Sequence, residues 1–379
     1  MGKKFIYIYK NIYFHFYKKY YKTFILNTIL YINFNNITMK LEQNNQQLNE
    51  HYNKVFDGKT TGKFIKMQLE YMINNMRRDF VFRQPTLCII QVEGDKASNI
   101  YVNNKIKACK EVGIRCEHVF IKQSDLKKLR LAHMAASYIQ RIIKEKNEDN
   151  TIDGIIVQLP IDLKSIFNSN NEIPKSYFDN LINSIIDKIE PKKDVDGLTL
   201  KNTGMLAQDR DGYYHIPATP LAIYTILKDY WKINLKGKRI TIIGRSNLLG
   251  KPLFHLLSNK TNGNAQVTLL HSLCEKENMN EAIRNSDIVI CCAGSPNEYI
   301  VNKDNIKDGA IIIDATINVK ADENGKQHLY GDADFVNIID KCEYITPVPG
   351  GVGPMTVAML LKNTFEAWTR NMTSQPFLK

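Results

Sequence analysis

The chain has 379 residues, of which 44% are hydrophobic and 24% are charged. That length is enough for two domains, and the ordinary composition excludes wholesale disorder and collagen-like repeats. None of the seven cysteines forms a C-x-x-C pair, and Cys291 and Cys292 adjoin in an apolar run. We therefore expect reduced thiols, with neither a disulfide scaffold nor a metal site.

The net charge of +12 is unevenly distributed, because residues 1–40 contain seven lysines and no acidic residue. The rest of the chain therefore carries only +5. Lysines scattered over solvated faces explain such a mild excess better than a nucleic-acid-binding stripe does. A mild excess also suits an anionic small ligand. We expect no nucleic-acid partner.

Residues 1–50 are predicted to be a leader or a disordered extension. Asparagines interrupt each apolar stretch before it reaches the roughly 20 residues of a membrane span, so no stable span is expected. The apolar run Phe24–Ile32 is followed by no small-residue cleavage site, and residues 1–38 lack the Arg and Ser of a mitochondrial presequence. We expect a cytosolic protein, with import into a mitochondrion or plastid through the leader as the alternative.

From residue 60 to residue 160, short apolar runs alternate with helical patterns. Pro85 and Gly94 bound the first run, Ser98 is expected to cap the next helix, and Gly113 is expected to end it. The predicted elements are helix 60–80, strand Thr86–Val92, helix Ser98–Glu111, strand His118–Ile121, helix 126–146 and strand Ile152–Leu159. Continuous apolar strands alternating with helices predict a parallel α/β sheet.

A second α/β series follows Leu163–Glu190, an Asn- and Lys-rich stretch that is predicted to be a loop containing a helix. Its predicted strands are Arg239–Ile243, Val267–Leu270, Ile288–Cys292, Ile311–Asp314 and Glu343–Thr346. A helix over Thr356–Arg370 ends the pattern.

A nucleotide-binding turn is predicted where the strand Arg239–Ile243 ends in Gly244 and Gly250 opens a helix. Only glycine lets a pyrophosphate approach the backbone N–H groups at a helix start closely. Gly–x5–Gly is a weak pattern by itself and is more often a plain turn. About 20 residues later an NAD site would offer an acid to the ribose, but this chain has His271 and Ser272 there, with Arg245 in the turn. We infer NADP rather than NAD.

A second candidate site begins with Tyr101 and Lys105, which are four residues apart and so share one helix face. Gln158 closes a predicted strand, and Asp194 and Asp196 follow in the next loop. Ligands of open α/β sheets collect at the carboxyl ends of strands. Taken singly, each feature also has a structural explanation: a solvent-facing pair, a hydrogen-bonded strand-end amide, and a turn or helix cap.

Five segments carry a family resemblance together. They are Gly94–Ala108, Asp153–Pro160, Lys193–Gly197, Gly244–Ser246 and the highly specific octapeptide Pro349–Thr356. In this order they resemble the bifunctional methylenetetrahydrofolate dehydrogenase/methenyltetrahydrofolate cyclohydrolase family. The resemblance runs from about Val55 to Trp368.

The resemblance implies a two-domain α/β fold with a cleft between the domains. A folate-binding catalytic domain is expected over 54–212, completed by a C-terminal helix that returns to it over 350–372. A Rossmann-like NADP-binding domain is expected over 213–349. The resemblance also implies a homodimer formed through the nucleotide domain.

The resemblance also assigns roles to residues of this chain. Lys105 is similar to the family's catalytic lysine, Gln158 to that lysine's partner, Tyr101 to the ring that stacks on folate, and Asp196 to the pterin-binding carboxylate. The loop residues implied to line the folate are Pro349, Gly350 and Gly351. The residues implied at the cofactor are Gly244, Arg245, Ser246, Gly250, His271, Ser272 and Ile317.

The implied function is NADP-dependent oxidation of 5,10-methylenetetrahydrofolate, followed by hydrolysis of the methenyl product to 10-formyltetrahydrofolate. Oxidation mainly needs alignment of the two reactants, whereas hydrolysis gains from a base. A lysine can act as that base when desolvation lowers its pKa, and a glutamine can hold the amine without adding charge.

Two positions depart from the family pattern: Ala218 stands where Cys is usual, and Thr316, expected near the nicotinamide, stands where Gly is usual. One alternative is a dehydrogenase-only member of the family, against which Lys105 and Gln158 speak. A basic Rossmann-scaffold nucleic-acid-binding protein would need clustered cations near aromatic residues, which the sequence lacks. An unrelated NADP oxidoreductase of amino or hydroxy acids leaves Pro349–Thr356 unexplained.

Overall fold

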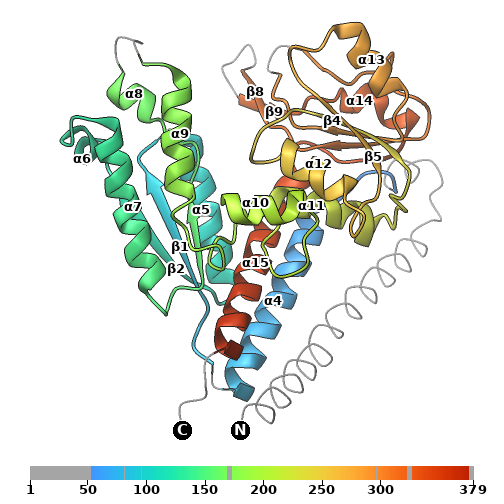
Figure 1. Cartoon of the computed structure of the whole chain (residues 1–379). Coiled ribbons are helices and arrows are strands. Elements are labelled where there is room, and N and C mark those ends of the chain that lie inside the picture. The colour runs from blue at the N-terminus through green and yellow to red at the C-terminus, as the bar shows by residue number, and fades with distance from the viewer. Residues whose placement is uncertain are drawn as a thin grey trace.

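The computed structural model describes residues 53–80, 82–94, 96–168, 173–295, 298–321 and 327–374, so the predicted leader lies outside the described residues. Two α/β lobes flank a central pair of helices, α4 (Gly58–Phe80) and α15 (Val352–Ser374), which lie side by side (Figure 1). None of the described helices combines the length and apolar character of a membrane span.

The first lobe is built on a parallel sheet with the order β2-β1-β3. Its strands are β1 (Thr86–Val92), β2 (Arg115–Ile121) and β3 (Gly154–Val157). All residues of β1 and β3 are buried, as expected for apolar strands covered by helices on both faces. The helices of this lobe are α5 (Lys96–Glu111), α6 (Gln123–Lys127), α7 (Ala132–Glu148), α8 (Leu163–Phe167) and α9 (Lys175–Ile186).

The second lobe contains a five-stranded parallel sheet with the order β10-β7-β6-β4-β5. Its elements are β4 (Arg239–Ile243), α12 (Gly250–Ser258), β5 (Gln266–Leu270), α13 (Lys276–Arg284), β6 (Ile288–Cys291), β7 (Ala310–Asp314), α14 (Phe335–Ile338) and β10 (Cys342–Ile345). The chain places β5 and β6 on opposite sides of β4, and dinucleotides bind at such a switch point. An antiparallel hairpin, β8 (Asn318–Ala321) and β9 (Gln327–Tyr330), is an addition that the sequence analysis does not foresee.

The two lobes share one hydrophobic core. A single buried cluster contains Leu87 of the first sheet, Ile240 of the second, Leu69 of α4 and Trp368 of α15. Two further helices, α10 (Leu200–Ala207) and α11 (Ala218–Thr225), lie between the lobes (Figure 1), and a π-helical turn over Ile226–Tyr230 follows. The predicted two-domain α/β fold with a returning C-terminal helix is therefore confirmed.

Several predicted helices differ in detail. The long helix over 126–146 is wrong, because Arg130 has a φ of 63° and divides it into α6 and α7. Helix α5 begins at Lys96, so Ser98 lies inside its first turn and is not its cap. The loop over 163–190 contains two helices instead of one. The C-terminal helix begins at Val352, four residues before its predicted start.

The ends of the strands differ from their predicted positions by only a few residues. Strand β2 begins at Arg115, three residues before the predicted start, because its exposed residues hide the apolar signal. Strand β3 is limited to Gly154–Val157, so Gln158 follows the strand directly and does not lie within it. Strands β1 and β4 match their predicted bounds.

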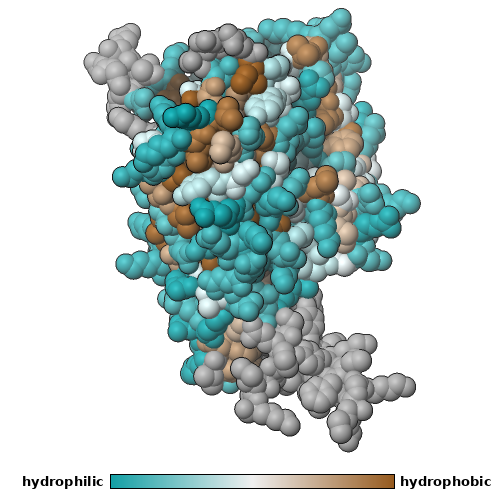
Figure 2. All heavy atoms as spheres, turned by 60° about the vertical axis from the view of Figure 1, so that its left-hand side comes forward, coloured by the Kyte–Doolittle hydropathy of each residue, from teal (hydrophilic) through white to brown (hydrophobic). Residues whose placement is uncertain are grey.

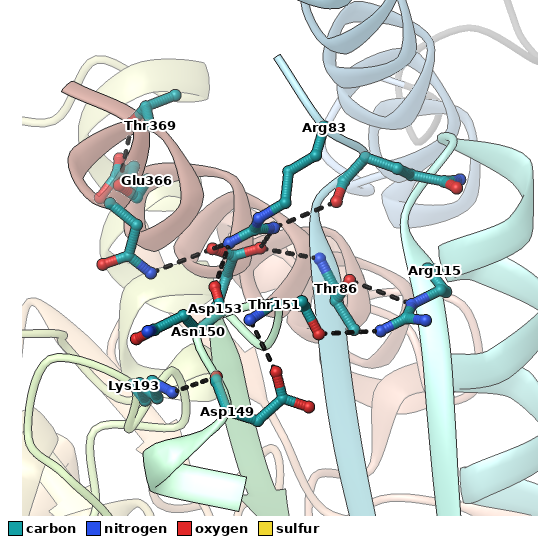
Figure 3. Close-up of polar contacts among 12 residues, drawn as sticks. Arg83, Thr86, Arg115, Asp149, Asn150, Thr151, Asp153, Lys193, Glu366 and Thr369 are labelled. Atoms are coloured by element: carbon teal, nitrogen blue, oxygen red, sulfur yellow. Dashed lines mark hydrogen bonds and ion pairs between the residues drawn. The ribbon is translucent and has the colours of Figure 1, made fainter. Parts of the chain in front are cut away.

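A polar cluster joins the end of α15 to the first sheet (Figure 3). Both guanidinium NH groups of Arg83 donate to Asp153 at 2.7 Å, and Asp153 also accepts from the Thr86 backbone N–H at 2.9 Å and from Asn371 Nδ2 at 3.0 Å. The Asp153 side chain is fully buried. Because a buried carboxylate needs this complement of donors, the cluster fixes α15 against the strand starts.

Figure 2 turns the first lobe toward the viewer. Hydrophilic side chains cover most of this face, and the apolar ones gather mainly in its upper half. Exposed apolar residues of α7 and α9 include Met134 and Tyr177.

Candidate active site

A cavity of about 750 Å³ lies where the two lobes meet. Helices α4 and α5 and the residues that follow β3 form its wall on the first lobe. The wall on the second lobe comes from residues 314–317, at the end of β7, and from the loop over 347–351. The cavity therefore draws on segments from both ends of the chain, as expected for a ligand site between lobes.

The cavity contains the predicted contact between Lys105 and Gln158. Lys105 Nζ donates to Gln158 Oε1 at 2.9 Å, and Gln158 Nε2 donates to the carbonyl oxygen of Leu159 at 2.6 Å. The Gln158 backbone N–H donates to the carbonyl oxygen of Ile90 at 2.8 Å, which extends the pairing of β1 and β3 by one residue. The amide is therefore held from two directions and presents its oxygen to the amine.

The surroundings of Lys105 favour the neutral amine. Burial lowers the pKa of Lys105, and the charge of Asp196 opposes that shift. Burial likewise raises the pKa of Asp196, against the effect of Lys105. Asp196 acts on Lys105 through its charge, although it is not among the cavity-lining residues. An amine and a carboxyl group that are both desolvated at one cleft are typical of sites where protons move.

The two aspartates of the 193–197 loop have separate environments. Asp194 is fully buried and accepts from the Leu198 and Thr199 N–H groups at 3.2 and 2.8 Å, and from Asn202 Nδ2 at 2.8 Å. Asp194 therefore has the turn-stabilising role that the sequence offers as the structural alternative. The charge of Asp196 acts on Lys105, and Asp196 is therefore the candidate for ligand binding.

Tyr101 and the 349–351 loop line the same cavity as the Lys105–Gln158 contact. Tyr101 lies one helical turn before Lys105 and keeps 46% of its surface exposed, so its ring is available for stacking. Pro349, Gly350 and Gly351 line the cavity as predicted. The loop packs against α4 so closely that a Cβ on Gly58 would lie 1.8 Å from the Gly351 carbonyl oxygen.

The cavity is more cationic than the sequence analysis suggests. Lysines 59, 63 and 66 of α4 line it, together with Lys105 and Lys107 of α5, whereas its only lining carboxylates among the described residues are Glu111 and Asp314. Lys66 pairs with Glu111. The spacing of the three α4 lysines, four and then three residues, marks one helix face and could have revealed them. This excess favours an anionic ligand.

The predicted nucleotide turn has the close backbone packing that requires glycine. Gly244 has a φ of 123°, and a Cβ there would lie 2.4 Å from the Cys292 carbonyl oxygen at the neighbouring strand end. A Cβ on Gly250 would lie 1.9 Å from the Gly244 carbonyl oxygen. Ser246 Oγ accepts from the Leu249 N–H at 3.2 Å. The turn therefore leads directly into the N-terminus of α12, the geometry that a pyrophosphate requires.

Arg245 and Ser272 are brought to the same edge of the second sheet. The residues two positions before them, Ile243 and Leu270, are register partners of parallel β4 and β5. Arg245 and Ser272 are both exposed, and the Leu273 N–H donates to His271 Nδ1 at 3.3 Å. No acidic residue follows β5 directly, which fits a phosphorylated ribose.

Apart from Asp196, the predicted site residues thus fall into two groups. Tyr101, Lys105, Gln158, Ile317 and the 349–351 loop line the cavity, whereas the residues expected at the phosphates do not. Leu248 of the nucleotide turn also lines the cavity and connects the two groups.

Of the two positions that depart from the family pattern, Ala218 is buried at the start of α11 and does not line the cavity, whereas Thr316 does. Asp314 and Asp332, both buried, adjoin Thr316 and are absent from the sequence prediction. Burial raises the pKa of Asp314 to about 7. Asp314 ends the predicted strand Ile311–Asp314, so the strand-end rule could have found it, whereas Asp332 is brought to Thr316 across the unpredicted hairpin.

Comparisons with known proteins identify the family of the chain. The family described as tetrahydrofolate dehydrogenase/cyclohydrolase matches with its catalytic domain over residues 56–196 and with its NAD(P)-binding domain over residues 217–372. The bifunctional protein FolD of Campylobacter hominis is 40% identical over 314 residues, which cover 83% of this chain and 96% of that protein.

Two solved structures share the fold over most of the chain. The methylenetetrahydrofolate dehydrogenase-cyclohydrolase of Trypanosoma brucei, solved with NADP cofactor and an inhibitor, is 32% identical with a TM-score of 0.71, covering 84% of this chain and 98% of that one. The 5,10-methylenetetrahydrofolate dehydrogenase of the silkworm, Bombyx mori, is 33% identical with a TM-score of 0.70, covering 84% and 99%.

Proposed function

The chain belongs to the tetrahydrofolate dehydrogenase/cyclohydrolase family, and from this premise we propose that the interlobe cavity serves two reactions. The chain oxidises 5,10-methylenetetrahydrofolate with NADP and hydrolyses the resulting methenyl cation to 10-formyltetrahydrofolate. The observation that carries this proposal is the 2.9 Å contact between Lys105 and Gln158 inside the cavity.

In the oxidation, the residues of this chain bind and align the substrate. Tyr101 stacks on the folate, the 349–351 loop encloses it, and Asp196 accepts from the N–H edge of the pterin, whose exocyclic amine needs an acceptor. Because the product is a resonance-stabilised cation, alignment contributes more than proton transfer does.

In the hydrolysis, Lys105 acts as the base. A water molecule attacks the methenyl carbon and transfers a proton toward Lys105 Nζ, which is competent because burial lowers its pKa. The bond between that carbon and N5 then breaks, N5 takes up a proton, and the carbon stays on N10 as the formyl group. Gln158 orients the amine through Oε1 and adds no charge that would hold it protonated.

The second lobe provides the NADP site. Bound NADP supplies the hydride acceptor. Gly244, Ser246 and Gly250 form the backbone turn that would hold its pyrophosphate, and Arg245, His271 and Ser272 would hold the 2′-phosphate. Ile317, at the cavity wall, would contact the nicotinamide. The close packing at Gly244 and the lack of an acid after β5 support this assignment.

The catalytic unit is proposed to comprise 54–212 together with 350–372, and the nucleotide unit 213–349. We propose a homodimer formed through the nucleotide unit and no nucleic-acid ligand. A cytosolic location is supported by the bacterial relatives. A fluorescent fusion of residues 1–55 would test the organellar alternative, which predicts that the fusion leaves the cytosol.

The deciding experiment compares Lys105→Met with Lys107→Met. Both lysines lie on α5 and line the cavity, but only Lys105 contacts Gln158. Lys105→Met is expected to abolish hydrolysis of supplied methenyltetrahydrofolate and to leave measurable NADP reduction, whereas Lys107→Met keeps both. A wild-type hydrolysis rate in Lys105→Met would refute the assignment. No hydrolysis in the wild type would favour the dehydrogenase-only alternative.

A further inference from the structure

Thr316 lies where the second lobe meets the cavity. It follows β7 by two residues, keeps only 7% of its surface exposed, and lines the cavity together with Ala315 and Ile317. In the sequence it stands where the family usually has glycine. A glycine would have no side chain here, so the contacts of the Thr316 side chain are specific to this chain.

The hydrogen bonds of Thr316 connect two buried carboxylates. Its backbone N–H donates to Asp314 Oδ1 at 3.0 Å, and its hydroxyl donates to Asp332 Oδ2 at 2.7 Å. Asp314 and Asp332 are 2% and 0% exposed, so both side chains depend on hydrogen-bond donors from the protein. A hydroxyl donor between them stabilises the arrangement more than a glycine could.

Asp332 in turn holds the loop that follows β6. It accepts from the backbone N–H groups of Ala293 and Gly294 at 3.1 Å each and of Ser295 at 2.9 Å. Asn318 Nδ2 donates to Asp332 Oδ1 at 3.0 Å. The loops after β6 and β7 both lie at the carboxyl edge of the sheet, where a dinucleotide binds.

We propose that Thr316 is a positioning residue for the nicotinamide half of NADP. Its hydroxyl fixes Asp332, and Asp332 fixes the 293–295 loop and the adjoining cavity wall against which that half of the cofactor lies. The proposal rests on the NADP site proposed for the second lobe and adds a determinant that acts on one end of the cofactor only.

The test measures binding in the absence of catalysis. Isothermal titration calorimetry gives the Kd of the full chain for NADP and for 2′-phospho-ADP-ribose, which lacks the nicotinamide. Thr316→Ala and Thr316→Val remove the hydroxyl and Thr316→Ser keeps it. Thr241→Val is the control, because Thr241 also carries a buried hydroxyl in this sheet, bonded to Ser286 Oγ at 2.6 Å, and does not line the cavity.

The Ala and Val variants are expected to bind NADP about tenfold more weakly, as loss of a hydrogen bond to a charged acceptor implies. Their Kd for 2′-phospho-ADP-ribose stays at the wild-type value. Thr316→Ser stays within about twofold of the wild type for both ligands. The KM for NADP rises in the Ala and Val variants and stays near the wild-type value in Thr316→Ser.

Three results would each overturn the proposal: wild-type NADP affinity in both Ala and Val variants, equal weakening for the two ligands, or the same loss in Thr241→Val. Failure of the wild type to bind 2′-phospho-ADP-ribose would instead contradict the NADP site itself. The two failures are therefore distinguishable.

Discussion

Gln158→Glu would place a negative charge where a neutral amide oxygen now accepts from Lys105 Nζ at 2.9 Å. The side chains have nearly the same shape, so the change is mainly electrostatic. A carboxylate at this distance favours the protonated amine and raises the pKa of Lys105, in the direction opposite to the effect of burial. At a fixed pH, fewer enzyme molecules then carry the neutral base.

The size of the effect follows from the distance. Two unit charges about 3 Å apart attract by about 5 kcal/mol at an effective dielectric constant of roughly 20. Lys105 is partly exposed, so solvent screening reduces this to about 2–3 kcal/mol. Each 1.4 kcal/mol changes the neutral fraction about tenfold, and the expected loss of cyclohydrolase rate at pH 7 is about fiftyfold.

The assay is the pH dependence of methenyltetrahydrofolate hydrolysis, followed by absorbance and corrected for the rate without enzyme. In Gln158→Glu the rising limb of the profile should move to higher pH. Gln158→Leu, which removes the contact without adding charge, should lower the rate but leave the limb near its wild-type position. A Gln158→Glu profile that coincides with the wild type would refute Lys105 as the base.

Three further substitutions test the remaining assignments. Arg245→Gln should raise the KM for NADP about tenfold and leave that for NAD unchanged, because only the phosphorylated ribose offers Arg245 an anion; a wild-type enzyme that strongly prefers NAD would refute that reasoning. Asp196→Ala should weaken folate binding in both reactions, and an unchanged folate affinity would exclude its pterin contact. Arg83→Leu leaves Asp153 buried without its cation and should lower the free energy of unfolding in urea by about 3 kcal/mol. The exposed pair of Arg78 and Asp79 provides the control, since Arg78→Leu should change the free energy of unfolding by less than about 1 kcal/mol.

The sequence predicted an element correctly where residues at its two ends, such as proline and glycine, mark where it begins and ends. Pro85 and Gly94 bound β1, and its predicted limits are correct. The break between α6 and α7 had no such signal, because a positive φ at Arg130 is a conformation that non-glycine residues rarely adopt. The amphipathic pattern of residues 126–146 continues through the break, so periodicity alone indicates one helix.

The site was predictable to the extent that spacing along one element determines it. Helical spacing places Tyr101 and Lys105 on one face, and the strand-end rule places Gln158 beside them. The same rules could not tell which of Asp194 and Asp196 is the ligand-binding candidate. That distinction depends on which carboxylate accepts hydrogen bonds from the backbone N–H groups of the turn over 197–199. The contact between Thr316 and Asp332 depends on a hairpin between them and was beyond local reasoning.

The two reactions place different demands on the joint between the lobes. In the proposed mechanism, hydrolysis uses Lys105 and Gln158, which both belong to the first lobe, whereas hydride transfer also needs the wall at Thr316 and Ile317 on the second. Reacting atoms must approach within about 3–3.5 Å for transfer, so a small change in lobe position suffices to lower its rate. Helices α4 and α15 set that position through the core they share with both sheets. Loosening their packing should therefore impair the dehydrogenase before the cyclohydrolase.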